Sequence, residues 1–362
     1  YFSVDAMNVP SSPRPDSSLF HAGNGVVCLV GEHADQFSNW AMVRIHGADA
    51  TTFLHNQLTQ DVALLPVHGA RLAAWCNAKG RMLASFVLVC ESKEKAGAAY
   101  WLLCRRDLLG QFVQKLKMFV LRSKVVIEDA TTTMEAYGLL GDAAVNAWQA
   151  QGGGMPPAPW QCQAVRENGL VRYLVSLYPA AAAPGQSAVP RTLCLQTPAL
   201  PVPDGPSLDM YQWEWSETAS GVATIENACS GVFVPQMVNF ESVGGVNFRK
   251  GCYPGQEVVA RSQFRGAIKR RGYIALAHDV AEKLAIAAGD DIWFRPASTA
   301  AEPAVCGTVV QSAVQGVDCV VFASLQNQAA DAVQAGDGSL HAGSMTGAEL
   351  KLRSLPYSLI AV

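Results

Sequence analysis

A cysteine enclosed by two glycines, in the second half of the chain, constrains the fold more than any other feature. Gly251 and Gly255 bracket Cys252, and glycine tolerates positive φ angles and close backbone approach. Pro254 lacks a backbone donor and cannot continue a strand, so it indicates a turn. Residues 256–264 contain no helix breaker. The pattern predicts a strand, a tight turn and a helix N-terminus, which lowers the pKa of a nearby thiol.

The segment around this cysteine is strongly basic. From residue 249 to residue 271 there are seven cations and one carboxylate, although the whole chain has a formal net charge of −3. Such a run can be a solvated face of the protein. Because it contains the glycine-enclosed cysteine, we favour an anion-binding site. The cations are Arg249, Lys250, Arg261, Arg265, Lys269, Arg270 and Arg271.

This segment resembles the signature of the YgfZ-type folate-binding proteins, which are relatives of the glycine-cleavage T-protein, an aminomethyltransferase. The matching residues are Lys250-Gly251-Cys252-Tyr253-Pro254-Gly255-Gln256-Glu257, followed by Arg261. A second block, residues 45–62, resembles the start of the same family, and the likeness extends from about residue 40 to residue 359. The resemblance implies that Cys252 is the functional thiol. The cofactor-binding residues that it implies in this segment are Lys250, Gly251, Tyr253, Gln256, Glu257 and Arg261.

The resemblance also implies an α+β fold, with two interleaved α+β subdomains and a C-terminal β-barrel around a central folate cavity. We place a flexible arm, rich in proline and serine, at residues 1–24. The folate-binding region spans 25–268 and the barrel 269–362. Short strands separated by Gly, Pro and Asp agree with a barrel, in which no helix of three turns is expected. Within it, residues 328–346 are expected to form a surface loop.

Two tryptophans stand where YgfZ-type proteins carry tryptophans implicated in folate binding. Trp40 begins a predicted strand and Trp213 lies in a predicted helix. A stacked indole suits a flat pteridine ring. Each could instead be a structural core residue, and Trp215 cannot face the same way as Trp213. Asn239 either bonds a pteridine edge or caps the turn that follows it.

The function that the resemblance implies is that of a tetrahydrofolate-binding accessory protein. Such proteins support iron–sulfur cluster assembly or repair and tRNA modification. The implied partners are folate and, transiently, iron–sulfur enzymes or assembly factors. We expect a monomer with no stable metal, no membrane contact and no direct nucleic-acid binding. Cys252 could contact folate, resolve an oxidised thiol, supply one ligand to a cluster shared with a partner, or only pack.

The alternative function is folate-dependent aminomethyl transfer, the T-protein reaction. Enzymes of that family carry an aspartate shortly after an Asn-x-x-Gly turn. The corresponding strand lies in residues 62–90, which contain no Asp or Glu. Without a carboxylate, a cationic amine has neither a partner nor a base. A classical aminomethyltransferase is therefore not expected.

Composition narrows the remaining classes. Half of the residues are hydrophobic and 16% are charged, which is typical of a globular chain. No run of about 18 apolar residues predicts a membrane span, and no secretory leader opens the sequence. The ten cysteines include no Cys-x-x-Cys pair, so zinc and cluster motifs are not expected. Scattered free thiols indicate a reducing compartment, and we expect a cytoplasmic protein.

Overall fold

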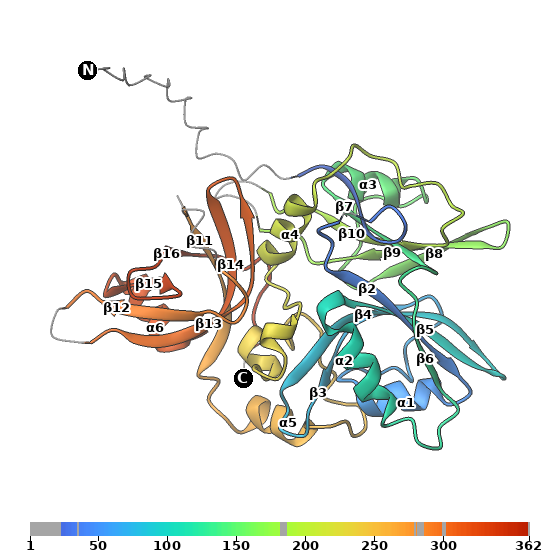
Figure 1. The fold of residues 1–362 in the computed structure, drawn as a ribbon, viewed down its shortest axis with the longest axis horizontal. Helices are drawn as coiled ribbons and strands as arrows, with labels where there is room; N and C mark the ends of the chain where they lie inside the picture. Colours follow the sequence, from blue (N-terminus) through green and yellow to red (C-terminus); the bar gives the residue numbers. More distant parts are fainter. Residues whose placement is uncertain are drawn as a thin grey trace, which may run out of the picture.

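Two five-stranded sheets and a closed barrel organise the chain in this computed structural model (Figure 1). The structure describes residues 23–34, 36–181, 187–278, 280, 286–298 and 302–360. Apart from its last two residues, the expected N-terminal arm lies outside this part. None of the helices in the described residues has the length and apolar character needed to cross a membrane.

The chain passes from the first sheet to the second and back, so the two α+β subdomains are interleaved as expected. The first sheet has the order β1-β7-β10-β9-β8 and the second β3-β4-β5-β2-β6, and every pairing is antiparallel. The first sheet comprises β1 (Gly25–Val30), β7 (Glu135–Leu140), β8 (Cys162–Glu167), β9 (Leu170–Ser176) and β10 (Arg191–Gln196). The second comprises β2 (Trp40–Gly47), β3 (Ala70–Cys76), β4 (Met82–Glu94), β5 (Gly97–Arg105) and β6 (Val126–Asp129).

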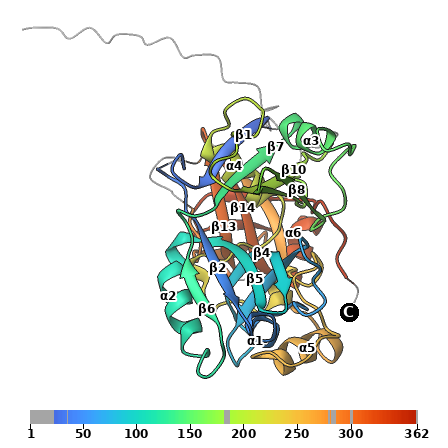
Figure 2. The ribbon, with the colours of Figure 1, turned by 90° about the vertical axis from the view of Figure 1, so that its right-hand side faces the viewer.

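Helices cover the second sheet because their apolar positions recur at helical spacing. In α2 (Arg106–Lys117), the buried side chains Leu108, Phe112 and Leu116 lie four residues apart on one face. Helix α1 (Ala50–Gln57) packs on the same subdomain, and α3 (Asp142–Gln149) packs on the first. Figure 2 shows α2 along the side of the second sheet and α3 at the opposite end of the molecule.

Helix α4 (Met210–Ala219) lies between the first sheet and the barrel. The closed barrel has the strand order β11-β14-β13-β12-β15-β16. Its strands are β11 (Arg270–Ala277), β12 (Asp291–Pro296), β13 (Ala304–Gln315), β14 (Asp318–Gln326), β15 (Gly338–Ala342) and β16 (Glu349–Arg353). Outward-facing barrel side chains such as Val310 and Phe322 belong to the same core as the sheets, whereas the barrel interior forms a core of its own.

Two local predictions are wrong, and one strand is not predicted. The expected loop 328–346 instead contains α6 (Asn327–Ala335) and β15. No strand is predicted at β10, yet it is fully buried between β7 and β9. The predicted strand before Cys252 is absent, because residues 244–252 form turns and irregular backbone. The predicted helix after it is α5 (Gln256–Phe264).

Candidate functional site

A pocket lies where the two sheets meet α4, and the space within it is about 490 Å³ when the open solvent at its mouth is included. Strands β3, β4 and β5 line one side, and β10, α4 and the segment after α4 line the other. Both predicted tryptophans face it. The lining residues are Trp40, Leu72, Ser85, Phe86, Val87, Leu103, Trp160, Leu177, Tyr178, Arg191, Leu193, Trp213, Glu217, Val222, Ala223 and Thr224.

Trp213 is held from three directions. The Asp209 side chain caps the start of α4 and fixes the helix that carries the indole. A side chain at Gly138 would bring a Cβ to 2.5 Å from the indole, so only glycine lets Trp213 lie against β7. The Arg191 guanidinium lies 4.7 Å from the ring centroid. The buried Trp213 Nε1 has no hydrogen-bond partner among the described residues. Because this nitrogen is only a donor, the site lacks an acceptor.

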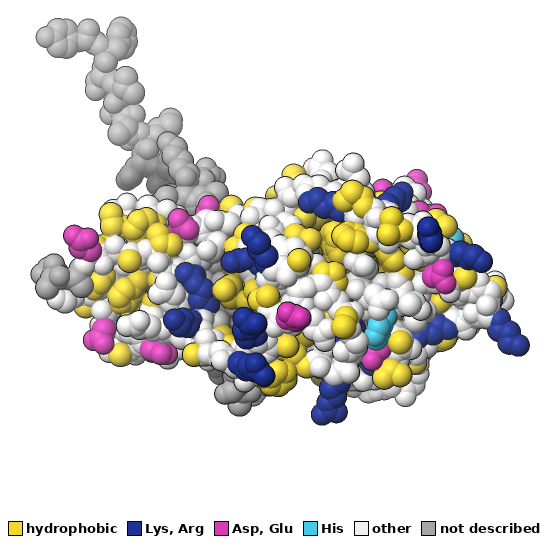
Figure 3. Space-filling view, turned by 90° about the horizontal axis from the view of Figure 1, so that it is seen from below, with side chains coloured by type: hydrophobic (Ala, Val, Ile, Leu, Met, Phe, Trp, Pro, Cys, Tyr) yellow, Lys and Arg dark blue, Asp and Glu magenta, His cyan; other side chains and the backbone are white. Residues whose placement is uncertain are grey.

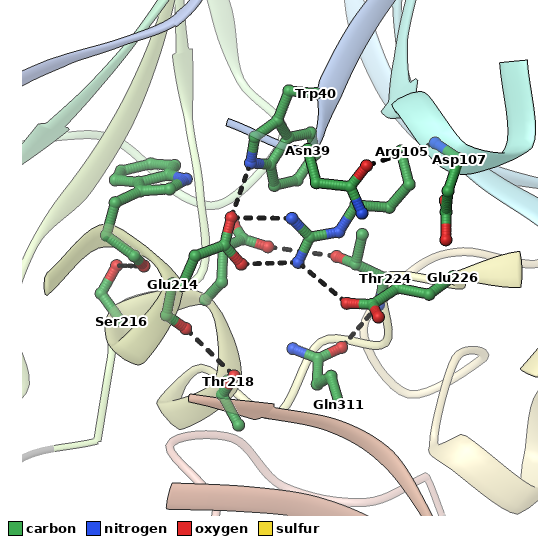
Figure 4. A network of polar contacts seen from close by, with 12 residues as sticks. Asn39, Trp40, Arg105, Asp107, Glu214, Ser216, Thr218, Thr224, Glu226 and Gln311 are labelled. Atoms are coloured by element: carbon green, nitrogen blue, oxygen red, sulfur yellow. Dashed lines mark hydrogen bonds and ion pairs between the residues drawn. The ribbon is translucent and has the colours of Figure 1, made fainter. Parts of the chain in front are cut away.

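Trp40 is fixed by charged groups. Its Nε1 donates to Glu214 Oε1 at 2.9 Å, and the Arg105 guanidinium lies 4.4 Å from its ring centroid. Arg105 makes two hydrogen bonds to Glu214, at 2.7 and 2.6 Å, and lies 3.4 Å from Glu226 (Figure 4). Burial disfavours both charges, but their mutual attraction outweighs it: the pKa of Arg105 is raised and that of Glu214 is lowered. Trp40 is therefore oriented by a buried ion pair.

A second buried ion pair forms the pocket wall opposite β4. Arg191 pairs with Glu217, and its Nε donates to Ser216 Oγ at 3.1 Å. Thr224 Oγ1 donates to Glu217 Oε2 at 3.1 Å. Among the described lining residues, Arg191 is the only cation and Glu217 the only carboxylate. The basic segment 249–271, in which an anion-binding site is expected, does not contribute to the described lining of this pocket.

The Asn239 side chain is bonded to the barrel. It sits in the left-handed region, with φ 56°, at the end of the 3₁₀ turn η2 (Pro235–Val238). Its Nδ2 donates to Gly272 O at 2.7 Å, and Gly272 N donates to its Oδ1 at 3.0 Å. Both ends of the amide are thus occupied by barrel strand β11. The contact ties the segment that follows η2 to the barrel.

Cys252 lies on the surface and is absent from the described pocket lining. Helix α5 starts after Gly255, which has φ +80°. An added Cβ there would lie 2.4 Å from Asn77 O and 2.5 Å from Gly80. The glycines of the two turns therefore allow the β3–β4 turn to approach the start of α5. Cys252 therefore lies on an exposed turn that packs against the β3–β4 turn.

The residue before this turn is a buried cation. Lys250 Nζ donates to Leu58 O at 2.8 Å and to His55 O, and it lies 4.8 Å from the Tyr253 ring centroid. Burial lowers the Lys250 pKa to about 8, against opposing attraction from Asp61 and Cys252. The same burial raises the Tyr253 pKa.

His55, which the sequence analysis did not select, is the neighbour of this turn. Its Nδ1 lies 3.3 Å from Asp61 Oδ1, and its Nε2 would lie 3.5 Å from a Cβ at Gly251. Burial, followed by repulsion from Lys250, lowers the His55 pKa. A neutral imidazole beside the Cys252 turn is a potential proton acceptor. No local sequence signal identifies it, because it lies almost two hundred residues away.

The remaining predicted residues divide between interior and surface. Gln256 Nε2 donates to Lys250 O at 3.3 Å and closes the turn. Glu257 and Arg261 are exposed on α5. The predicted site is thus two places: the tryptophan pocket, and the Cys252 turn with α5. Among the described residues, no three His, Cys, Asp or Glu side chains are grouped to hold a metal ion.

Comparison with known proteins gives relatives along nearly the whole chain. It is 29% identical to the tRNA-modifying protein YgfZ of Serratia proteamaculans (strain 568), covering 98% of both chains. It is 32% identical to the tRNA-modifying protein YgfZ of Sodalis glossinidius (strain morsitans), over 89% of this chain and 92% of that protein. No family model matches the chain.

A solved structure shares the architecture. The glycine cleavage system aminomethyltransferase T from Bartonella henselae aligns with a TM-score of 0.56 and 14% identity, over 93% of this chain and 88% of that one. This likeness confirms the predicted T-protein-like fold. The full-length sequence relatives are more specific. On their evidence, the chain belongs to the YgfZ family.

Proposed function

We propose that this protein binds tetrahydrofolate or a derivative in the tryptophan pocket and acts as an accessory protein in tRNA modification. One observation carries the proposal: Trp40 and Trp213, far apart in sequence, line one pocket. The role in tRNA modification is proposed because the relatives are named tRNA-modifying proteins. The T-protein-like fold supports a folate ligand.

The lining of the pocket suits a pteridine ring in its chemistry. Its wall is mostly apolar and aromatic, which suits a flat heterocycle. The unpartnered Trp213 Nε1 needs an acceptor, and the carbonyl oxygen and ring nitrogens of a pteridine are acceptors. Trp40 and Trp213 would hold the ring, with Arg191 and Glu217 beside them. Bound reduced folate would supply one-carbon chemistry.

Cys252 is the proposed functional thiol. It is exposed and belongs to the segment that carries the family signature, and His55 and Lys250 lie beneath its turn. We propose that it serves iron–sulfur enzymes or assembly factors that act in tRNA modification. All ten cysteines, which lie within the described residues, are free, and this supports a reducing, cytoplasmic location.

Folate titration tests the pocket. Tetrahydrofolate should quench tryptophan emission of the full chain. Trp213→Ala should weaken binding tenfold or more, because it removes the stacking surface and the donor together. Trp148→Phe is the control: Trp148 is also buried, but it belongs to α3, outside the pocket lining, and donates to Thr192 Oγ1. Unchanged affinity in a Trp40→Ala/Trp213→Ala protein would show that folate binds elsewhere.

A cell-based assay tests the thiol. Cys252→Ala should lose support of the tRNA modification while the protein folds and binds folate normally. The purified protein should also release no ammonia from the aminomethyl-lipoyl carrier, because residues 62–90 contain no carboxylate. Full complementation by the alanine variant would leave Cys252 with a packing role only, and ammonia release would favour the transferase alternative.

A further inference from the structure

A cluster of cations in and around α5 lies outside the described lining of the tryptophan pocket. Four of its five side chains are exposed and the fifth, Arg270, is partly buried, and within the described residues none of them forms an ion pair. In contrast, Arg271 in the same run is buried and paired with Glu241. The five are Arg249, Arg261, Arg265, Lys269 and Arg270. We name this group the α5 basic face.

Three short segments bring these cations together. Arg261 lies in the last turn of α5, and Arg265 caps the end of the helix with its backbone N–H donating to Arg261 O at 3.0 Å. The ring of Phe248, next to Arg249, lies 5.4 Å from that of Phe264. Strand β11 begins shortly after the helix ends. Figure 3 shows Lys and Arg side chains gathered over this part of the surface.

An exposed aromatic ring lies within the cluster. Phe264 is 69% exposed, although it is one of the largest apolar side chains on α5. Its T-shaped contact with Phe248 fixes the orientation of the ring. Val258, on the same helix, is also exposed. A rigid, exposed ring among unpaired arginines is typical of surfaces on which nucleic-acid bases stack.

We propose that the α5 basic face binds RNA directly, with the cations on phosphates and Phe264 as a stacking platform for an unpaired base. The proposal extends the role in tRNA modification proposed above and rests on it. It differs from the expectation drawn from the net charge of −3, because the positive charge is concentrated on one face. RNA held here would lie on the surface next to Cys252, whose turn leads directly into α5.

RNA explains this surface better than an acidic protein does. Unpaired arginines would suit either partner, since carboxylates and phosphates are both recognised by guanidinium groups. A protein interface, however, is built around a buried apolar core, whereas the exposed apolar side chains here are few. One accessible ring surrounded by cations suits a flexible single strand of RNA, whose unstacked bases can stack on the ring.

Fluorescence anisotropy with labelled bulk tRNA tests the proposal. The full chain should bind, with an affinity that falls steeply between 50 and 200 mM salt, as roughly one counterion is released per phosphate contact. Arg265→Glu/Lys269→Glu should weaken binding about tenfold or more and lower the salt slope by roughly 1.5. Phe264→Ala should weaken binding about fivefold, with little change in slope.

Lys95→Glu/Arg122→Glu is the matched control, because it makes the same charge change at exposed positions outside the face. It should bind tRNA nearly as the unmodified chain does. Tetrahydrofolate titration of every variant keeps the two proposals apart, since folate affinity should not change. Equal losses in the control and α5 variants, or tRNA binding unaffected by both α5 changes, would overturn the proposal. Loss of modification in cells with intact tRNA binding would assign the face to a protein instead.

Discussion

At the scale of single residues, Cys252 is the exposed cysteine, and the other nine cysteines are buried or partly buried. Burial raises the pKa of Cys76, Cys104 and Cys194 to about 12, whereas Cys252 is exposed. A thiol-specific reagent at pH 7.5 should therefore modify one cysteine of the native protein much faster than the rest, because the thiolate is the nucleophile.

Cys252→Ser should remove this fast phase. Cys162→Ser is the control that should retain it, since Cys162 is partly buried and its pKa is also raised to about 12. Mass mapping of the first modified site distinguishes the two. Fast modification of any other cysteine would contradict the assignment of Cys252 as the accessible thiol.

Lys250 links stability to pH at the same turn. Its pKa is about 8 in the folded protein, against an ordinary value of 10.5. The unfolded chain therefore holds a proton that the folded protein releases, so the free energy of unfolding should rise with pH between 8 and 10.5. This contribution is lost as the pH falls through 8.

Comparison with Lys250→Met isolates this contribution from other groups that titrate at high pH. Urea unfolding of both proteins at pH 7 and pH 10 should show the unmodified chain gaining stability relative to the variant. A difference between the two proteins that is the same at both pH values would mean that Lys250 titrates normally.

At the scale of elements, the α5 turn depends on one glycine. Gly255 has φ +80°, and a Cβ there would lie 2.4 Å from Asn77 O. Gly255→Ala should therefore lower the free energy of unfolding by more than the roughly 1–2 kcal/mol of left-handed backbone strain alone. Gly110→Ala, in an exposed part of α2 with nothing near its Cβ, should stabilise by about 0.5–1 kcal/mol. Thermal unfolding measures both, and equal shifts would contradict the steric account.

Strong local patterns made most elements predictable. The segment 256–264, which contains no helix breaker, is helix α5, and the strand predicted to begin at Trp40 is β2. Helix α6 and strand β15 were missed because their segment is rich in Ala, Gln, Gly and Ser and carries little apolar periodicity. Strand β10 was missed because it is a six-residue segment between proline-rich stretches. Its burial comes from pairing with β7 and β9, which no local pattern reveals.

At the scale of the whole molecule, the site could be predicted only in parts. The family resemblance selects Trp40, Trp213 and Cys252. It cannot show that the indoles share a pocket while the thiol lies on another surface. The Arg105–Glu214 ion pair joins residues 109 positions apart. Ion pairs of this kind depend on how the two sheets meet α4. Residue spacing along the chain does not reveal that arrangement.

The barrel should unfold together with the sheets. Phe322 lies on its outer wall, fully buried in the core that also contains Trp213, whereas Leu340 belongs to the separate interior core. Arg271 and Gly272 bond to Glu241 and Asn239 across the same boundary. Because these contacts make the interface continuous with the main core, calorimetry should show one transition whose calorimetric and van't Hoff enthalpies agree.

Phe322→Ala should lower the free energy of this single transition by about 3–5 kcal/mol through the cavity it leaves. Leu340→Ala, which affects only the barrel interior, should lower the same transition by about 2–5 kcal/mol without creating a second one. A separate early transition in the Leu340→Ala protein would show that the barrel is an independent folding unit. In that case the contacts of Asn239 and Arg271 would only position the barrel, and the tryptophan pocket should survive barrel unfolding with its folate affinity intact.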